Sequence, residues 1–117
     1  MIHVENLVGG EFVELEENFD NLSPLDFSVI AKIPRTRSVD DAVISAKRAL
    51  PGWSGLSLLE RCDWLDKIAN ALEANIDEVA RLESLDTGKP LDVALNVDAT
   101  RSVNNFRFFA NFRQLFK

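Results

Sequence analysis

The chain has 117 residues, with 19 acidic and 13 basic side chains, a net charge of −6 at pH 7 and one cysteine. This length suits one domain or part of one, and the negative charge argues against nucleic acid or an anionic membrane as a partner, because both require a concentrated cationic surface. One cysteine excludes an internal disulfide, and no run approaches the ~18 apolar residues of a membrane span. Because the amino terminus also lacks the pattern of a secretory signal, we expect a cytoplasmic protein.

The amino-terminal residues predict a β-hairpin. Residues 4–8 and 11–15 are strand-like runs on either side of Gly9 and Gly10. Two consecutive glycines readily adopt the positive φ angles of a two-residue hairpin turn. The acidic residues between 14 and 20 are then expected to form an exposed connection.

A second strand region follows this connection. Residues 21–26 have the composition of a turn, and residues 27–33 alternate apolar and polar side chains, as a strand with one apolar side does. Pro34 is expected to end this strand. We therefore expect strands and turns over residues 1–37 and helices over residues 38–117, within a single partial domain.

The first helix is expected to begin at Ser38, a favourable N-cap residue, with two aspartates in the first turn, where the helix dipole favours carboxylates. A narrow apolar stripe that includes several alanines follows. Pro51 and Gly52 are expected to end the helix, and Trp53 is expected to pack in the corner before the next one.

Residues 57–90 predict one long amphipathic helix, because apolar side chains recur at intervals of three and four residues. Ser57 and Glu60 have the spacing of a capping box at its start. Gly88 can adopt the left-handed conformation after the last turn, and Pro90 cannot continue the hydrogen-bond ladder.

Residues 91–116 predict a third helix that is rich in phenylalanine. Five of the eight phenylalanines lie between Phe106 and Phe116. Burying one such ring contributes about 1.5–3 kcal/mol, and three helices with a few strands offer little surface against which to bury them. We therefore expect this helix to bind a surface outside the chain, or to self-associate.

Motifs for catalysis or cofactor binding are missing from the sequence. The five glycines do not form a Gly-x-Gly-x-x-Gly turn, and proline follows Gly88 and Lys89 where a phosphate-binding loop requires serine or threonine. Cys62 lies on the apolar stripe of a helix, which is typical of a buried structural cysteine. His3, the only histidine, is expected to be solvated. No residue is therefore assigned a catalytic or cofactor-binding role.

Asp86 lies in the last turn of the long helix, where its charge opposes the negative end of the helix dipole. This placement costs about 0.3–1 kcal/mol unless a cation or a donor compensates. Two explanations stay open at this point: a local partner such as Lys89 or a backbone amide, and a bound ion or a donor from elsewhere in a larger protein.

Together these segments resemble the amino-terminal portion of the NAD(P)-dependent aldehyde dehydrogenase superfamily. The most specific block is Leu-Glu-Ser-Leu-Asp-Thr-Gly-Lys-Pro at residues 82–90. The resemblance extends to about Ala110 and also covers residues 6–13, 23–24, 29–34, 40–46, 51–54, 59–61 and 105–110. Within the superfamily, residues 101–110 are most similar to the muconic-semialdehyde and betaine-aldehyde branches.

This resemblance implies an α+β fragment of an α/β fold, in which a β-hairpin and a strand pair precede three helices and the Rossmann sheet is missing. The family oxidises an aldehyde to a carboxylic acid with NAD or NADP, using a cysteine thiolate, a glutamate-activated water and an asparagine amide. These groups would follow residue 117. The chain alone is therefore expected to be a structural, inactive fragment.

The resemblance also implies the partners of the chain and one ion site. The partners would be the rest of the fold or a full-length homologue. The ion would be a structural monovalent cation, bound by main-chain oxygens of Asn21 and Leu22 and by the carboxylate of Asp86. The alternative interpretation is a non-enzymatic helical interaction module that associates with a full-length dehydrogenase or with itself.

Overall fold

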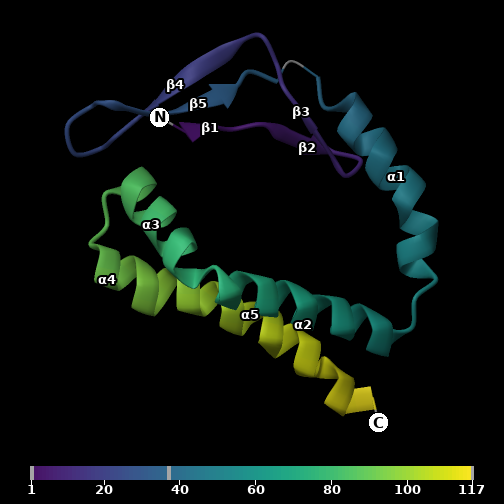
Figure 1. Ribbon diagram of the computed structural model, residues 1–117. Coiled ribbons are helices and arrows are strands. Elements are labelled where there is room, and N and C mark those ends of the chain that lie inside the picture. The colour runs from purple at the N-terminus through teal and green to yellow at the C-terminus, as the bar shows by residue number, and fades with distance from the viewer. Residues whose placement is uncertain (1, 37, 117) are drawn as a thin grey trace. The chain divides into compact units, whose positions relative to one another are not determined.

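The computed structural model describes residues 2–36 and 38–116, and it divides into two compact units, Met1–Gly55 and Leu56–Lys117. The first unit contains every strand of the described chain and one helix, and the second unit is helical (Figure 1).

The first unit contains two small sheets (Figure 1). In the three-stranded sheet, β5 (Val29–Pro34) lies in the centre, parallel to β1 (Ile2–His3) and antiparallel to β4 (Asn18–Leu22). The second sheet is an antiparallel hairpin formed by β2 (Asn6–Val8) and β3 (Glu11–Val13).

The predicted hairpin is confirmed, although its strands are shorter than expected. Gly9 and Gly10 have φ angles of 63° and 86°, as a type I′ turn requires at both central positions. The first strand of the hairpin was expected to begin at Val4. The N–H of Val4 donates to the carbonyl of Lys32 at 3.1 Å, so this residue is bound to β5 and not to the hairpin.

The expected exposed connection is confirmed for Glu14, Glu16 and Glu17, but it ends earlier than expected, because residues 18–22, with Asp20, form β4. Asp20 lies opposite Lys32 in the ladder with β5, and the two side chains form an ion pair. The charge that favoured a loop is therefore one half of a cross-strand pair, a type of contact that stabilises sheets.

The central strand β5 begins later than predicted and is covered on both faces. Phe27 has a φ of 58° and belongs to the turn, where its N–H donates to the carbonyl of Ser23 at 3.0 Å. Ile30 and Ala31 are consecutive, yet both are buried. Consecutive side chains point to opposite faces of a sheet, so the burial of both shows that β5 is not a strand with one solvated side.

Helix α1 (Asp40–Ser54) begins one residue later than predicted, with Val39 and not Ser38 at the N-cap position, and it also ends later. Its first residue donates its N–H to the hydroxyl of Ser38 at 3.3 Å. Pro51 does not end the helix, which continues to Ser54, and the Pro51 carbonyl accepts from the N–H of Gly55 at 3.0 Å. Trp53 belongs to the last turn and is 44 % exposed, so the expected packing in a corner is also wrong.

The second unit consists of helical segments in which α2 and α5 run side by side (Figure 1). In chain order these segments are α2 (Leu58–Ala74), α3 (Ile76–Thr87), α4 (Leu91–Val93), the π-helical segment η1 (Ala94–Ala99), α5 (Thr100–Ala110) and the 3-10 segment η2 (Asn111–Phe116).

The predicted single helix over residues 57–90 is two helices, because Asn75 interrupts it. The backbone of Asn75 is not helical, with φ −118° and ψ 22°. Its side-chain amide donates to the carbonyl of Ala71 at 2.8 Å, and its backbone N–H donates to the carbonyl of Leu72 at 3.1 Å. Asparagine competes in this way with the regular helical hydrogen bonds, and the chain turns into α3.

Both predicted ends of this helical region are confirmed. The Glu60 N–H donates to the Ser57 hydroxyl at 3.2 Å, and the Ser57 N–H donates to the Glu60 carboxylate at 2.8 Å, which completes the capping box. At the other end, Gly88 adopts the left-handed conformation with φ 73°, and its N–H donates to the carbonyl of Ser84 at 2.9 Å.

The helix predicted over residues 91–116 is continuous but contains the π-helical segment η1. Ala94 and Ala99 lie at the two ends of this segment, and both are buried together with Ala80 of α3. Residues five apart differ by about 140° around an α-helix, whereas i to i+5 hydrogen bonding brings them close to one face. The π segment therefore allows both alanines to pack toward α3.

Small side chains form the contact between α2 and α5. Cys62 and Ala69 of α2 and Val103 and Ala110 of α5 are each at most 4 % exposed. Such residues allow two helix axes to approach closely, and the burial of Cys62 confirms the structural role predicted for it.

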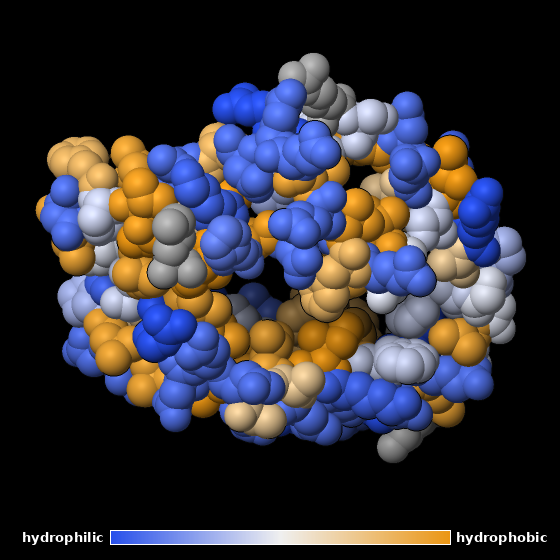
Figure 2. Space-filling view, turned by 45° about the horizontal axis from the view of Figure 1, so that its top comes forward, coloured by the Kyte–Doolittle hydropathy of each residue, from blue (hydrophilic) through white to orange (hydrophobic). Residues whose placement is uncertain are grey.

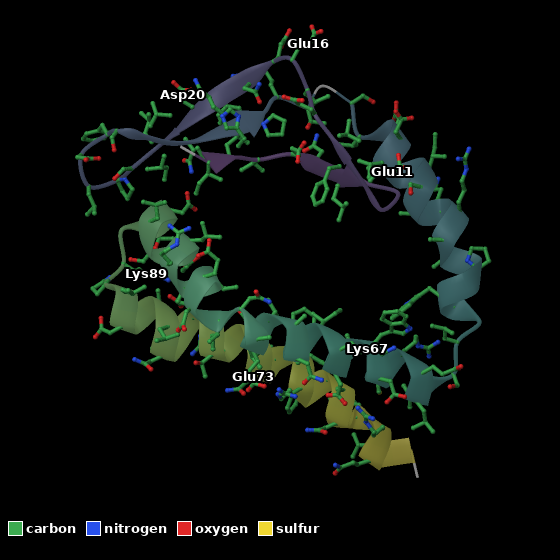
Figure 3. The ribbon with its side chains drawn as sticks, viewed as in Figure 1. Glu11, Glu16, Asp20, Lys67, Glu73 and Lys89 are labelled. Atoms are coloured by element: carbon green, nitrogen blue, oxygen red, sulfur yellow. The ribbon has the colours of Figure 1, made fainter. Side chains whose placement is uncertain are left out.

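Two arginines of the last helical segments reinforce this contact from one side. Arg107 forms an ion pair with Glu73, which lies on the side of α2 toward α5 (Figure 3). Arg113 donates to Asp63 at 2.7 Å and also pairs with Asp66. Polar residues of α2 thus bind the last helix.

Substituting Ala69 tests the close approach of α2 and α5. Ala69 is fully buried, so we expect Ala69→Leu to lower the free energy of unfolding by about 1–3 kcal/mol, because the added atoms would force the helices apart. Ala71→Leu is the matched control, since Ala71 is exposed on the same helix. Equal losses in urea unfolding of the two variants would contradict close packing at Ala69.

A second prediction concerns the capping box. The Ser57 N–H and hydroxyl hold the pKa of Glu60 below its usual range. The stability that Glu60 contributes is therefore present at neutral pH and is lost as the pH falls through its folded-state pKa. We expect Ser57→Ala to lower the free energy of unfolding by about 0.5–2 kcal/mol and to weaken its acid dependence, measured by thermal unfolding from pH 7 to pH 3. Ser57→Thr keeps a capping hydroxyl and should retain both properties.

Candidate functional site

Two of the predicted cation ligands lie in an irregular part of the first unit. Asn21 and Leu22 belong to β4, and the register with β5 shifts between them, since Asn21 pairs with Ala31 and Leu22 pairs with Val29. Ile30 is the residue skipped on β5. This is a β-bulge, and bulges redirect groups away from a regular ladder.

Asp86, the third predicted ligand, lies in the second unit. It is exposed in the last turn of α3, two residues before the left-handed Gly88. In the part of the chain that the structure describes, no three histidine, cysteine, aspartate or glutamate side chains are grouped as they would be to hold a metal ion. The cation site formed by Asn21, Leu22 and Asp86 therefore stays a prediction.

Lys89 binds other carboxylates at the end of α3. It lies at the corner between α3 and α4 (Figure 3), where its ammonium group donates to Asp98 at 2.7 Å and to Glu83 at 3.3 Å. These two contacts, the Asp98 hydrogen bond first, raise the pKa of Lys89. The sequence did not indicate that Lys89 joins Glu83 of α3 to Asp98 of η1.

The cysteine and the histidine lie in different units, and each is described in its own surroundings. Cys62 is 2 % exposed between α2 and α5, and His3 is exposed in β1. A catalytic thiol must be reached by its substrate and activated by a neighbouring base or positive charge. The burial of Cys62 is therefore that of a structural residue.

The first unit also contains a cleft that sequence reasoning missed. It has a volume of about 730 Å³ and is lined by the hairpin, by residues 15–17 and by the start of α1. Two of its lining residues form a hydrogen bond, in which the side-chain amide of Asn6 donates to the hydroxyl of Thr36 at 2.8 Å. The charged residues that line it are Glu16, Glu17, Arg35 and Asp41. Its walls come from segments far apart in the chain, so no local pattern could have indicated it.

The second unit exposes a cluster of aromatic rings. Phe108, Phe109 and Phe112 are 62 %, 56 % and 37 % exposed. Their ring centroids are 5.3 Å apart for Phe108 and Phe109, 5.6 Å for Phe108 and Phe112, and 5.7 Å for Phe109 and Phe112. These three residues are called the aromatic triad below. The side chain of Phe116, also predicted to be apolar surface, lies outside the described residues.

Large apolar side chains are exposed in both units. The space-filling view shows apolar residues in orange at the surface among polar residues in blue (Figure 2). Leu25 and Phe12 of the first unit are 77 % and 71 % exposed, and Trp64 of α2 is 48 % exposed. None of the described helices is long and apolar enough to span a bilayer.

Comparison with known proteins gives these features a context. Residues 12–115 match the family described as the aldehyde dehydrogenase family, so the match extends beyond Ala110, where the resemblance was expected to end. The chain is 41 % identical over 110 residues to a 2-aminomuconic semialdehyde dehydrogenase of Danio rerio, covering 92 % of this chain and 23 % of that protein. A 2-aminomuconic 6-semialdehyde dehydrogenase of Pseudomonas sp is 39 % identical over 114 residues, and the match covers 95 % of this chain and 23 % of that protein.

Solved structures show the same relationship in three dimensions. The NAD⁺ complex of an aldehyde dehydrogenase from Bacillus cereus superposes with a TM-score of 0.88 at 31 % identity, over 94 % of this chain and 24 % of that chain. PnpE from Pseudomonas sp. WBC-3 superposes with a TM-score of 0.86 at 37 % identity, over 96 % of this chain and 24 % of that chain. The chain thus spans about a quarter of the length of these proteins.

These matches confirm the predicted fold class, an α+β portion of the aldehyde dehydrogenase fold, and the predicted similarity to the muconic-semialdehyde branch. They cover the strands and the helices alike, so a separate helical interaction module is not favoured. The chain belongs to the aldehyde dehydrogenase family.

Proposed function

We propose that the chain is the amino-terminal scaffold of an NAD(P)-dependent aldehyde dehydrogenase, and that the complete enzyme oxidises an aldehyde to a carboxylic acid. One observation carries this proposal. Nearly the whole of this chain agrees in sequence and fold with several dehydrogenases, and it corresponds to about a quarter of the length of each. Because several of these relatives are named 2-aminomuconic semialdehyde dehydrogenases, we propose a semialdehyde of this kind as the substrate.

The proposed role of this chain is structural. Its described residues include no glycine-rich turn that could bind a dinucleotide phosphate, so they do not fit a nicotinamide cofactor on their own. NAD or NADP is therefore assigned to the part of the fold that this chain does not span. The one thiol, at Cys62, is buried in a helix contact and contributes to packing.

The proposed partner is the rest of an aldehyde dehydrogenase fold or a full-length homologue. An interior built from small side chains, together with large apolar side chains at the surface, supports this assignment. The proposed location is the cytoplasm, where a single free thiol is stable as such.

A monovalent cation is proposed to bind main-chain oxygens of Asn21 and Leu22 and the carboxylate of Asp86. The β-bulge at Asn21 and Leu22 supports the proposal, because a bulge redirects backbone groups, among them the main-chain oxygens proposed as ligands, away from the regular ladder.

An activity measurement tests the scaffold role. A chimera in which this chain replaces the matching segment of the Danio rerio relative is expected to form NADH from 2-aminomuconic semialdehyde, whereas the purified 117-residue chain is expected to form none. The absorbance of NADH at saturating substrate measures both. Turnover by the chain alone, or a folded chimera without activity, would contradict the proposed function.

The same chimera tests the cation site. We expect sodium or potassium chloride to raise its melting temperature above the value in choline chloride of equal ionic strength, because only the small cations can be bound by oxygen ligands. Asp86→Asn should remove this difference, and Asp92→Asn, an exposed acid outside the site, should preserve it. Identical melting curves in all three salts would exclude a structural cation at Asp86.

A further inference from the structure

The aromatic triad lies on a helix whose other side is already occupied. Val103 and Ala110 of α5 are buried in the contact with α2. On the same helical segments, Arg107 and Arg113 bind carboxylates of α2. The side toward α2 therefore has both its apolar and its charged contacts satisfied within the second unit.

The charges of this segment indicate the chemistry of a partner. Between residues 102 and 116 the only charged side chains are Arg107 and Arg113, and both form ion pairs with α2. The remaining side chains of residues 102–116 are apolar, amide or hydroxyl groups. An anionic lipid surface would require a cationic rim around the rings, whereas the two arginines of this stretch are paired with carboxylates of α2.

The length of the relatives identifies the occupant. In proteins of the same fold, this chain corresponds to 23–24 % of one longer polypeptide. Three rings in mutual contact, of which two are more than half exposed, form an unfinished apolar cluster when only this portion is present. A cluster of this kind is completed when apolar groups of the remaining polypeptide cover it.

We propose that Phe108, Phe109 and Phe112 are the anchor through which the last helix packs onto an uncharged, apolar surface of the rest of the aldehyde dehydrogenase fold. This inference rests on the proposed function and adds the surface by which the scaffold is held. The anchor is a packing site, and it contacts neither substrate nor cofactor.

Hydroxyl-radical footprinting of the chain alone and of the chimera described above tests this anchor. In the isolated chain, Phe108 and Phe109 should oxidise readily, while the buried Val103 provides the protected reference. In the chimera, oxidation of both rings should fall to the level of Val103. Rings that stay as reactive in the chimera as in the chain would overturn the anchor, whether or not the chimera is active. Protection that rises with the concentration of the isolated chain would assign the triad to a second copy and would also overturn it.

A single substitution provides an independent measurement. Phe108→Glu removes an exposed ring and its contacts with two other rings, so it should lower the melting temperature of the isolated chain slightly and that of the chimera more, because the charge would be buried there. Asn104→Glu, at another exposed position of α5, is the matched control and should change neither. Equal losses for Phe108→Glu in the chain and in the chimera would mean that Phe108 acts only within the second unit. A chimera that protects the rings but forms no NADH would support the anchor while contradicting the proposed function.

Discussion

The close contact between α2 and α5 is the constraint on which the second unit depends. Cys62 and Ala69 of α2 and Val103 and Ala110 of α5 are buried, and their small side chains allow the two helices to approach one another. Arginines of the last helical segments then bind carboxylates of α2 beside this contact. Because the interior is built from small side chains, no large side chain among the described residues is fully buried, and the large apolar groups remain at the surface.

This distribution of apolar groups is typical of part of a larger interior. A self-sufficient domain of this length buries about two-thirds of the surface of its unfolded chain, and its phenylalanines would be among the first side chains covered. Here the aromatic triad is exposed although its helix is well packed on the opposite side. The exposure is therefore not a sign of a loosely packed helix, and it agrees with a chain that spans about a quarter of its relatives.

The break at Asn75 and the π-helical segment η1 together set the position of α3 within the second unit. Asn75 turns the chain out of α2, and the π-helical segment η1 adjusts the register so that Ala94 and Ala99 both pack near Ala80. Lys89 joins Glu83 of α3 to Asp98 of η1 across the same corner. The position of α3, and with it of the proposed cation ligand Asp86, is thus set by contacts among three short segments.

The sequence by itself determined the features that depend on a few neighbouring residues: the turn at Gly9 and Gly10, the capping box at Ser57, the left-handed Gly88 and the burial of Cys62. Each of these follows from local hydrogen bonding or from a helical apolar stripe, which a linear reading can detect. Only the tertiary structure decided the features that depend on distant partners. Asp20 lies in a strand because Lys32 lies opposite, and the π segment forms where Ala80 of another helix is packed. The cleft and the aromatic triad likewise depend on which side chains the folded chain covers, and the free energy of that burial comes from contacts between segments that no single stretch contains.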